Sequence, residues 1–174
     1  MNPSFQKATR LLMTAIFIAL SVSSPAQVEN APASLAVALT LKLAAFEKHI
    51  SMNEDVSLFV FGAPDVAAEF ETVIGNSIGN ATLSTVSQGD TLPEEPPTIL
   101  FVGPKTDVDQ ALSYSRKHKI LSITASPGLV NRGITLGIGV GKDGKPVIKL
   151  NLSATIEEGI TWNPAIMKIA KTVK

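Results

Sequence analysis

The sequence predicts an α/β fold, a single compact domain in which helices flank a mixed β-sheet. Three short apolar runs, at residues 56–61, 98–102 and 120–125, alternate with stretches of helical periodicity. This alternation implies parallel strands joined by right-handed helical crossovers. Residues 134–152 instead alternate apolar with small or polar side chains around Asp143-Gly144, which is typical of an antiparallel hairpin. The hairpin makes the predicted sheet mixed.

The first residues have the pattern of a secretory signal. Lys7 and Arg10 precede the apolar run 11–22, which is followed by small residues. An apolar core of this length is short for a membrane span, and small residues suit a signal peptidase site. We therefore expect residues 1–26 to be a signal peptide, cleaved before Gln27, and the mature protein to be periplasmic. An uncleaved membrane anchor is the alternative.

The composition describes one globular domain at residues 27–174. The whole chain has 174 residues, is 45% hydrophobic and carries fifteen basic and fifteen acidic side chains. A formal net charge of zero offers no broad electrostatic footprint for a phosphate backbone, so no nucleic-acid partner is predicted. The chain has no Cys, which excludes disulfides, thiolate metal sites and a Cys nucleophile.

Five helices are expected from apolar spacing and terminal signals. Their residues are 34–50, Pro64 to Gly75, Thr106 to His118, Ser153 to Gly159, and a last helix that begins at Asn163-Pro164 and has Ile166, Ile169, Ala170 and Val173 on its apolar side. Thr106 with Asp109, and Ser153, are the expected N-terminal caps of the third and fourth. Residues 81–86 are predicted to form a further strand and residues 88–97 a loop.

One face of the hairpin's first strand is nearly bare. Leu136, Ile138 and Val140 alternate with Gly137 and Gly139. Glycine weakens a strand, so its repetition indicates that something approaches this face closely. Packing of the last helix inside the domain is one interpretation, and a ligand or partner is the other. Gly137 and Gly139 are therefore candidate contact residues.

One segment of the predicted hairpin has the residue pattern of a phosphate-binding loop but not its structural context. Residues 139–145 fit the pattern G-x-x-x-x-G-K, but Pro146 and a strand follow. A phosphate-binding loop needs Ser or Thr at that point and a helix whose N-terminus faces the phosphates. No nucleotide site or other cofactor is predicted.

The residues that commonly carry catalysis are not arranged for it in the sequence. His49 and His118 lack a second ligand at metal-binding helical spacing. Glu157 and Glu158 are neighbours on a predicted helix, point about 100° apart, and are expected to form a solvated face. No G-x-S-x-G pattern stands between a predicted strand and a predicted helix, where a nucleophile elbow would lie. We predict no catalytic residue and no metal site, and we expect a protein that is not an enzyme.

Protein recognition is the expected function, with the last helix as the main contact. Trp162 is the sole tryptophan and precedes this helix, where it could anchor a partner or fill the domain's own core. Ile166 follows on the helix. In the loop before the hairpin, Asn131 and Arg132 could contact a partner or clamp a carboxylate or phosphate, although a plain surface charge is the alternative for Arg132.

The chain resembles a family of exported bacterial proteins. The segments ILSITASPGLVNRGITLGIGV (120–140) and GKPVIKLNLSATIEEGI (144–160) match the course of the YfiR family, also called DUF4154, and the likeness extends over the mature domain. The first helix departs from the family pattern because Phe46 is its only aromatic residue, and the cysteines that some members pair are absent.

The resemblance implies a YfiR-like α/β domain that acts without catalysis. It implies a periplasmic regulator that binds and restrains the extracytoplasmic part of an inner-membrane signalling protein, typically a diguanylate cyclase in cyclic di-GMP signalling. A homodimer is possible. The alternative function is a periplasmic small-molecule sensor that serves a membrane histidine kinase or a transport system.

N-terminal sequencing of the exported protein should find Gln27 as the first residue, because a short apolar core followed by small residues directs cleavage there. A membrane-bound product that still begins at Met1 would show that the segment is retained as an anchor.

Overall fold

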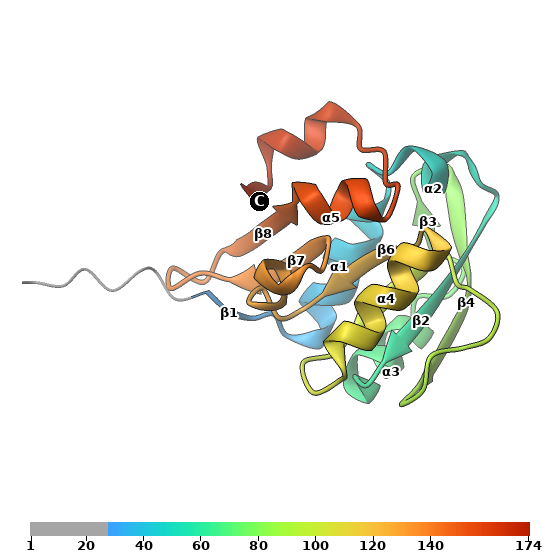
Figure 1. The fold of residues 1–174 in the computed structure, drawn as a ribbon. Helices are drawn as coiled ribbons and strands as arrows, with labels where there is room; N and C mark the ends of the chain where they lie inside the picture. Colours follow the sequence, from blue (N-terminus) through green and yellow to red (C-terminus); the bar gives the residue numbers. More distant parts are fainter. Residues whose placement is uncertain (1–27) are drawn as a thin grey trace, which may run out of the picture.

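The computed structural model describes residues 28–174, and the predicted signal peptide lies outside them. These residues form a nine-stranded mixed sheet of order β3-β4-β2-β5-β6-β7-β8-β9, with β1 added beside β7 (Figure 1). The sheet carries helices on both faces (Figure 1). The predicted fold class is confirmed.

The strands follow the chain in the order that the sequence predicts, with three short additions. They are β1 (Glu29–Asn30), β2 (Asp55–Phe61), β3 (Ser77–Ile78), β4 (Ala81–Gly89), β5 (Ile99–Val102), β6 (Leu121–Thr124), β7 (Leu136–Val140), β8 (Pro146–Asn151) and β9 (Lys171–Val173). The additions are β1, β3 and β9, of two or three residues each.

The helices are shorter than the sequence predicts. They are α1 (Ala33–Ala44), α2 (Lys48–Met52), α3 (Pro64–Glu71), α4 (Val108–His118) and α5 (Leu152–Glu157), with the 3₁₀ turns η1 (Leu129–Arg132) and η2 (Pro164–Lys168). Pro64 begins α3, as expected. The sequence predicts that this helix reaches Gly75 with Ile74 on its inward side, but Ile74 lies beyond the end of α3 and is 47% exposed.

The centre of the sheet is parallel. β4 and β5 flank β2, and β6 and β7 continue the parallel series. β7 and β8 form the predicted antiparallel hairpin, in which Leu136 lies opposite Leu150. Residues 139–145 therefore belong to a hairpin and its turn.

The central strands are apolar throughout because both of their faces are covered. Leu58 and Val60 of β2 join the core beneath α1 and α3, whereas Phe59 and Phe61 pack with α4 residues. The same alternation runs through β5. Strands that are covered on both faces are expected to have continuous apolar sequences.

The predicted single helix over residues 34–50 is wrong, because the chain turns between α1 and α2. Glu47 is extended, and its buried carboxylate accepts hydrogen bonds from Ile50 N at 2.7 Å and Thr161 N at 3.0 Å. Its backbone forms an isolated antiparallel bridge with Trp162. A distant segment of the chain thus ends α1, which helical spacing alone does not reveal.

The predicted last helix is also wrong beyond its first turn. Asn163 caps it and Pro164 begins it as expected, but the helix is only the 3₁₀ turn η2. The chain then extends, and Val173 lies beside Asn151 as β9 adds to the open edge of β8. The end of the chain satisfies a sheet edge instead of continuing a helix.

Two helix caps differ from the prediction. The cap of α4 is Asp107, whose side chain accepts a hydrogen bond from Gln110 N at 3.1 Å. The cap of α5 is Asn151, which accepts from Ala154 N at 2.9 Å. Leu152 therefore begins a helix rather than ending the hairpin. Each loop contains more than one residue of the types that cap helices, such as Asn, Asp, Ser and Thr. Their capping preferences are too similar to predict which one is the cap.

The bare face of β7 is closed by the chain itself, but not by its last helix. A Cβ atom on Gly137 would clash with Val130, and one on Gly139 would clash with Pro127 and lie 2.7 Å from Glu29 O. The covering segments are therefore the loop before β7 and the strand β1, which pairs with β7.

Gly139→Ala should lower the free energy of unfolding by about 1–3 kcal/mol, because the new methyl group meets backbone that cannot move aside. Urea denaturation measures this loss. Gly128→Ala is the matched control, since nothing lies within 4 Å of its Cβ position, and we expect a change within about 0.5 kcal/mol. Equal effects of the two variants would contradict the close packing described for β7.

Candidate functional site

The most unusual polar group of the domain is the carboxylate of Glu158, at the end of α5. It is fully buried, so the prediction of a solvated face is wrong for this residue. Its Oε1 atom accepts hydrogen bonds from Ser115 Oγ at 2.7 Å and Ser122 Oγ at 2.6 Å. Its Oε2 atom accepts from Thr135 Oγ1 at 2.7 Å and Ser122 N at 3.0 Å.

These donors come from elements that are far apart in the sequence. Ser115 lies on α4, Ser122 on β6, and Thr135 immediately before β7. None of the four partners is a cation. A buried carboxylate of this kind is held by neutral donors, whose hydrogen bonds replace the water that it loses on folding.

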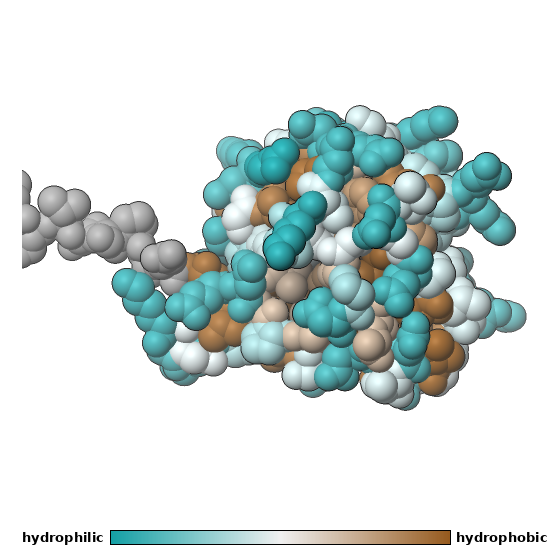
Figure 2. Space-filling model, turned by 90° about the horizontal axis from the view of Figure 1, so that it is seen from below, coloured by the Kyte–Doolittle hydropathy of each residue, from teal (hydrophilic) through white to brown (hydrophobic). Residues whose placement is uncertain are grey.

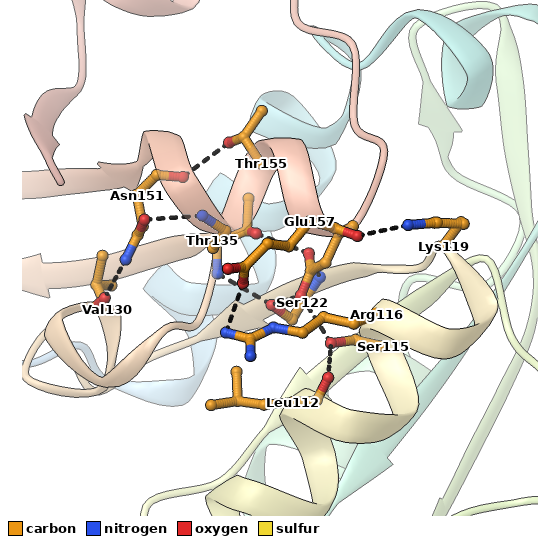
Figure 3. A network of polar contacts seen from close by, with 12 residues as sticks. Leu112, Ser115, Arg116, Lys119, Ser122, Val130, Thr135, Asn151, Thr155 and Glu157 are labelled. Atoms are coloured by element: carbon orange, nitrogen blue, oxygen red, sulfur yellow. Dashed lines mark hydrogen bonds and ion pairs between the residues drawn. The ribbon is translucent and has the colours of Figure 1, made fainter.

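Burial dominates the titration of this group. Loss of solvent raises the pKa of Glu158 above its ordinary value, although hydrogen bonds from Ser122, Thr135 and Ser115 act in the opposite direction. The adjacent Glu157 is partly exposed and pairs with Arg116, whose Nη2 lies 2.7 Å from Glu157 Oε2. Lys119 Nζ donates to the carbonyl of Glu157 (Figure 3).

A second polar cluster adjoins the first through β8 (Figure 3). Asn151 donates from Nδ2 to Val130 O at 2.8 Å, and its carbonyl accepts from Thr155 Oγ1 at 2.8 Å. Trp162 Nε1 in turn donates to Thr155 Oγ1 at 3.2 Å. The cluster fixes the loop before β7, the start of α5 and the tryptophan relative to one another.

The chemistry available to these groups is structural. Glu158 is sealed from solvent, and its hydrogen bonds lead into the fold rather than to a cavity. Within residues 28–174, no group of three or more His, Cys, Asp or Glu side chains could hold a metal ion.

The structure separates the candidate contact residues into two sets. Gly137, Gly139 and Ile166 are buried, and Trp162 is 8% exposed and packs in the main core. These four residues are therefore not accessible to a partner in this structure.

Asn131 and Arg132 are exposed, on the 3₁₀ turn η1. Arg132 Nη2 lies 3.4 Å from Asp109 Oδ1, an exposed pair at the limit of a hydrogen bond. Such pairs contribute little to stability, so the guanidinium can leave Asp109 and bind another carboxylate at low cost. A partner contact at these two residues stays a prediction.

A surface groove of about 680 Å³ lies between α1 and α3. Val37, Ala38 and Leu41 form much of its α1 wall, and Val73 lies across from them. Small side chains at Ser34, Ala38 and Ala45, four and seven residues apart, are the sequence signal that the face is hollowed.

Comparison with known protein families decides the assignment. The model of the YfiR/HmsC-like family, DUF4154, matches residues 33–171, from the start of α1 to β9. The chain belongs to the YfiR/HmsC-like family. Membership supports a general role as a periplasmic regulator of cyclic di-GMP signalling. No curated protein matched the sequence.

A solved structure supports the fold. The chain is similar to the crystal structure of a conserved domain protein from Vibrio cholerae O1 biovar El Tor strain N16961, with a TM-score of 0.54 and 13% sequence identity. The similarity covers 84% of this chain and 61% of that chain, so this YfiR/HmsC-like domain spans less than two thirds of its neighbour. In the described part of the chain, no helix is long and apolar enough to cross a membrane.

Glu158→Gln should alter the pH dependence of stability. Because the folded pKa is raised, the folded protein binds this proton more tightly than the unfolded chain. The resulting stabilisation is complete below the ordinary pKa of an unfolded glutamate, 4.5, and is lost as the pH rises through the folded pKa. The stability of the native protein relative to Glu158→Gln should therefore fall as the pH rises above the ordinary pKa of a glutamate and through the raised pKa of Glu158.

Urea denaturation at each pH measures the difference, and Glu157→Gln is the control. That variant removes the same charge one residue earlier from a partly exposed side chain, so its curve should run nearly parallel to that of the native protein. A stability difference for Glu158→Gln that grows with pH would mean that the hydrogen bonds outweigh burial and that the pKa is lowered.

Proposed function

We propose that this protein binds and restrains the extracytoplasmic part of an inner-membrane signalling protein, and that the signalling protein is a diguanylate cyclase. The observation that carries the proposal is the family match, which covers nearly the whole described fold. Regulation by binding needs no reactive group, so the proposed function is not enzymatic.

The arrangement of the polar side chains supports a binding function. The buried carboxylates of Glu47 and Glu158 accept hydrogen bonds from groups within the fold, and each is held by a different set of donors. Arg132, in contrast, presents a planar fork of donors at the surface with one weak neighbour. We propose Asn131 and Arg132 as part of the partner contact.

Deletion of the gene should raise cellular cyclic di-GMP, because the restrained cyclase is released, and expression of the native protein should return the level to normal. Arg132→Glu should fail to restore it, since the reversed charge repels a carboxylate on the partner. The thermal melt of Arg132→Glu should match the native one, because the ion pair of Arg132 with Asp109 is exposed.

Lys117→Glu is the matched control for charge. Lys117 is exposed on α4, and the substitution changes the net charge by the same amount. It should restore cyclic di-GMP to the native level. An unaltered cyclic di-GMP level after deletion would overturn the proposed regulation, whereas equal failure of both variants would overturn the contact at Arg132.

A small-molecule sensor is the second candidate function, and the groove between α1 and α3 favours it. Its volume of about 680 Å³ falls within the range of small-molecule sites, and its walls are mainly aliphatic. A sensor that serves a histidine kinase or a transport system would leave cyclic di-GMP unchanged in the deletion strain, so the same measurement separates the two functions.

A further inference from the structure

The charges of the domain are separated along the sheet. Residues 139–151 and 160–174 hold six lysines and one acidic residue, Asp143. Residues 50–104 hold eight acidic residues and neither Lys nor Arg. The strand order places the first set at the β8-β9 edge and the second set around β2, β3 and β4 (Figure 1). We call the first set, Lys142, Lys145, Lys149, Lys168, Lys171 and Lys174, the lysine edge.

The lysine edge places like charges side by side. Lys149 and Lys171 are register partners on adjacent parallel strands and therefore share one face of the sheet. Like charges in this position are destabilising. Among the described residues, the only ion pair of this edge joins Lys145 to Asp143, at 3.4 Å.

The helix dipole does not explain these lysines. A long last helix, as the sequence predicts, would favour positive charge at its C-terminus. The structure ends the 3₁₀ turn at Lys168, and Lys171 lies on β9. The remaining positive charge therefore has no acceptor within the described fold.

Aliphatic side chains are exposed among the lysines. Ile169 is 48% exposed and Met167 is 46% exposed. Ile169 also lines a hollow of about 440 Å³ with Ile148, Val28 and the lysines of the hairpin turn. Figure 2 shows hydrophilic side chains projecting at the end of the molecule where the described chain begins, with small apolar patches beside them.

We propose that the lysine edge docks the domain on a membrane surface of anionic lipids. Lys side chains attract lipid headgroups as flexible point charges, while exposed aliphatic groups can enter the interface. Protein interfaces instead favour Trp, Tyr and Arg and are depleted in Lys. This edge contains no Tyr or Arg, and its Trp162 is buried.

The acidic end of the sheet then sets the orientation of the domain. Repulsion from the same lipids turns residues 50–104 away from the membrane, so that the domain stands with β9 at the surface and β4 distant from it. The inference goes beyond the proposed regulatory function and does not depend on it, because it requires lipid alone.

Co-sedimentation with vesicles tests the proposal, using the chain from Gln27, which carries the whole described fold. The protein should bind phosphatidylcholine vesicles that contain ~30 mol% phosphatidylglycerol, fail to bind pure phosphatidylcholine, and dissociate at about 0.5 M NaCl. The combined variant Lys142→Gln, Lys145→Gln, Lys171→Gln should bind on the order of 100-fold more weakly.

The matched control is Lys48→Gln, Lys105→Gln, Lys117→Gln, which removes three exposed lysines from other parts of the surface. It should change binding less than about threefold. Equal losses in the two triple variants would show that net charge alone is responsible and would overturn the assigned edge. If the first triple variant does not fold, Lys171→Gln alone should weaken binding about fivefold, and an unchanged affinity would overturn the proposal.

The lipid composition separates the proposal from its main competitor. Equal binding to neutral and anionic vesicles would overturn an electrostatic contact. Binding only to membranes that contain the signalling protein, with none to pure lipid, would indicate an acidic protein surface and would overturn the lipid assignment.

Discussion

The burial of one carboxylate ties together elements that the chain order keeps apart. Glu158 lies at the end of α5, and its four hydrogen bonds reach α4, β6 and the residue that leads into β7. An unpaired carboxylate in this place would be too costly for the domain to fold, so each donor must be present at its own position. The hairpin, α5 and α4 are consequently fixed as one unit.

Glu47 holds the segment that follows α5 at its far end, as Glu158 holds it at its start. Its carboxylate accepts from Thr161 N and Ile50 N, and Trp162 pairs with its backbone. Residues 158–162 are thus held between two buried glutamates, one from each side. Thr161 N donates to Glu47 and Asn163 N donates to Phe46 O, and a helix that ran from α5 through these residues would break both contacts.

The parts of the fold that sequence could predict are those decided locally or by two-sided burial. β2, β5 and β6 were predictable because continuous apolar runs suit covered parallel strands, and the β7–β8 hairpin because alternation brackets an Asp-Gly turn. The end of α1 and the strand β9 were not, because contacts with distant segments override helical spacing there. Terminal strands of a few residues depend on the edge that they meet, which the local sequence does not describe.

The candidate site was predictable only in part, for a related reason. Exposure of a polar residue in a loop can be predicted from the local sequence, and Asn131 and Arg132 are both exposed. Whether Trp162 faces a partner or the core depends on the bridge to Glu47, 115 positions away in the sequence, and the core contains it. Nothing in the residue pair Glu157-Glu158 tells which member is buried, since that choice rests on the hydroxyl groups of Ser115, Ser122 and Thr135.

Charge shows most clearly how the fold adds information to the sequence. A formal net charge of zero suggests a protein without an electrostatic preference, although residues 50–104 carry eight acidic residues and neither Lys nor Arg. Strand order converts that distribution into a spatial one, because β3 and β4 lie at one edge of the sheet and β8 and β9 at the other. A different strand order, with β8 and β9 next to β4, would bring the lysines beside the acidic residues. The electrical polarity of the domain is therefore a property of its topology.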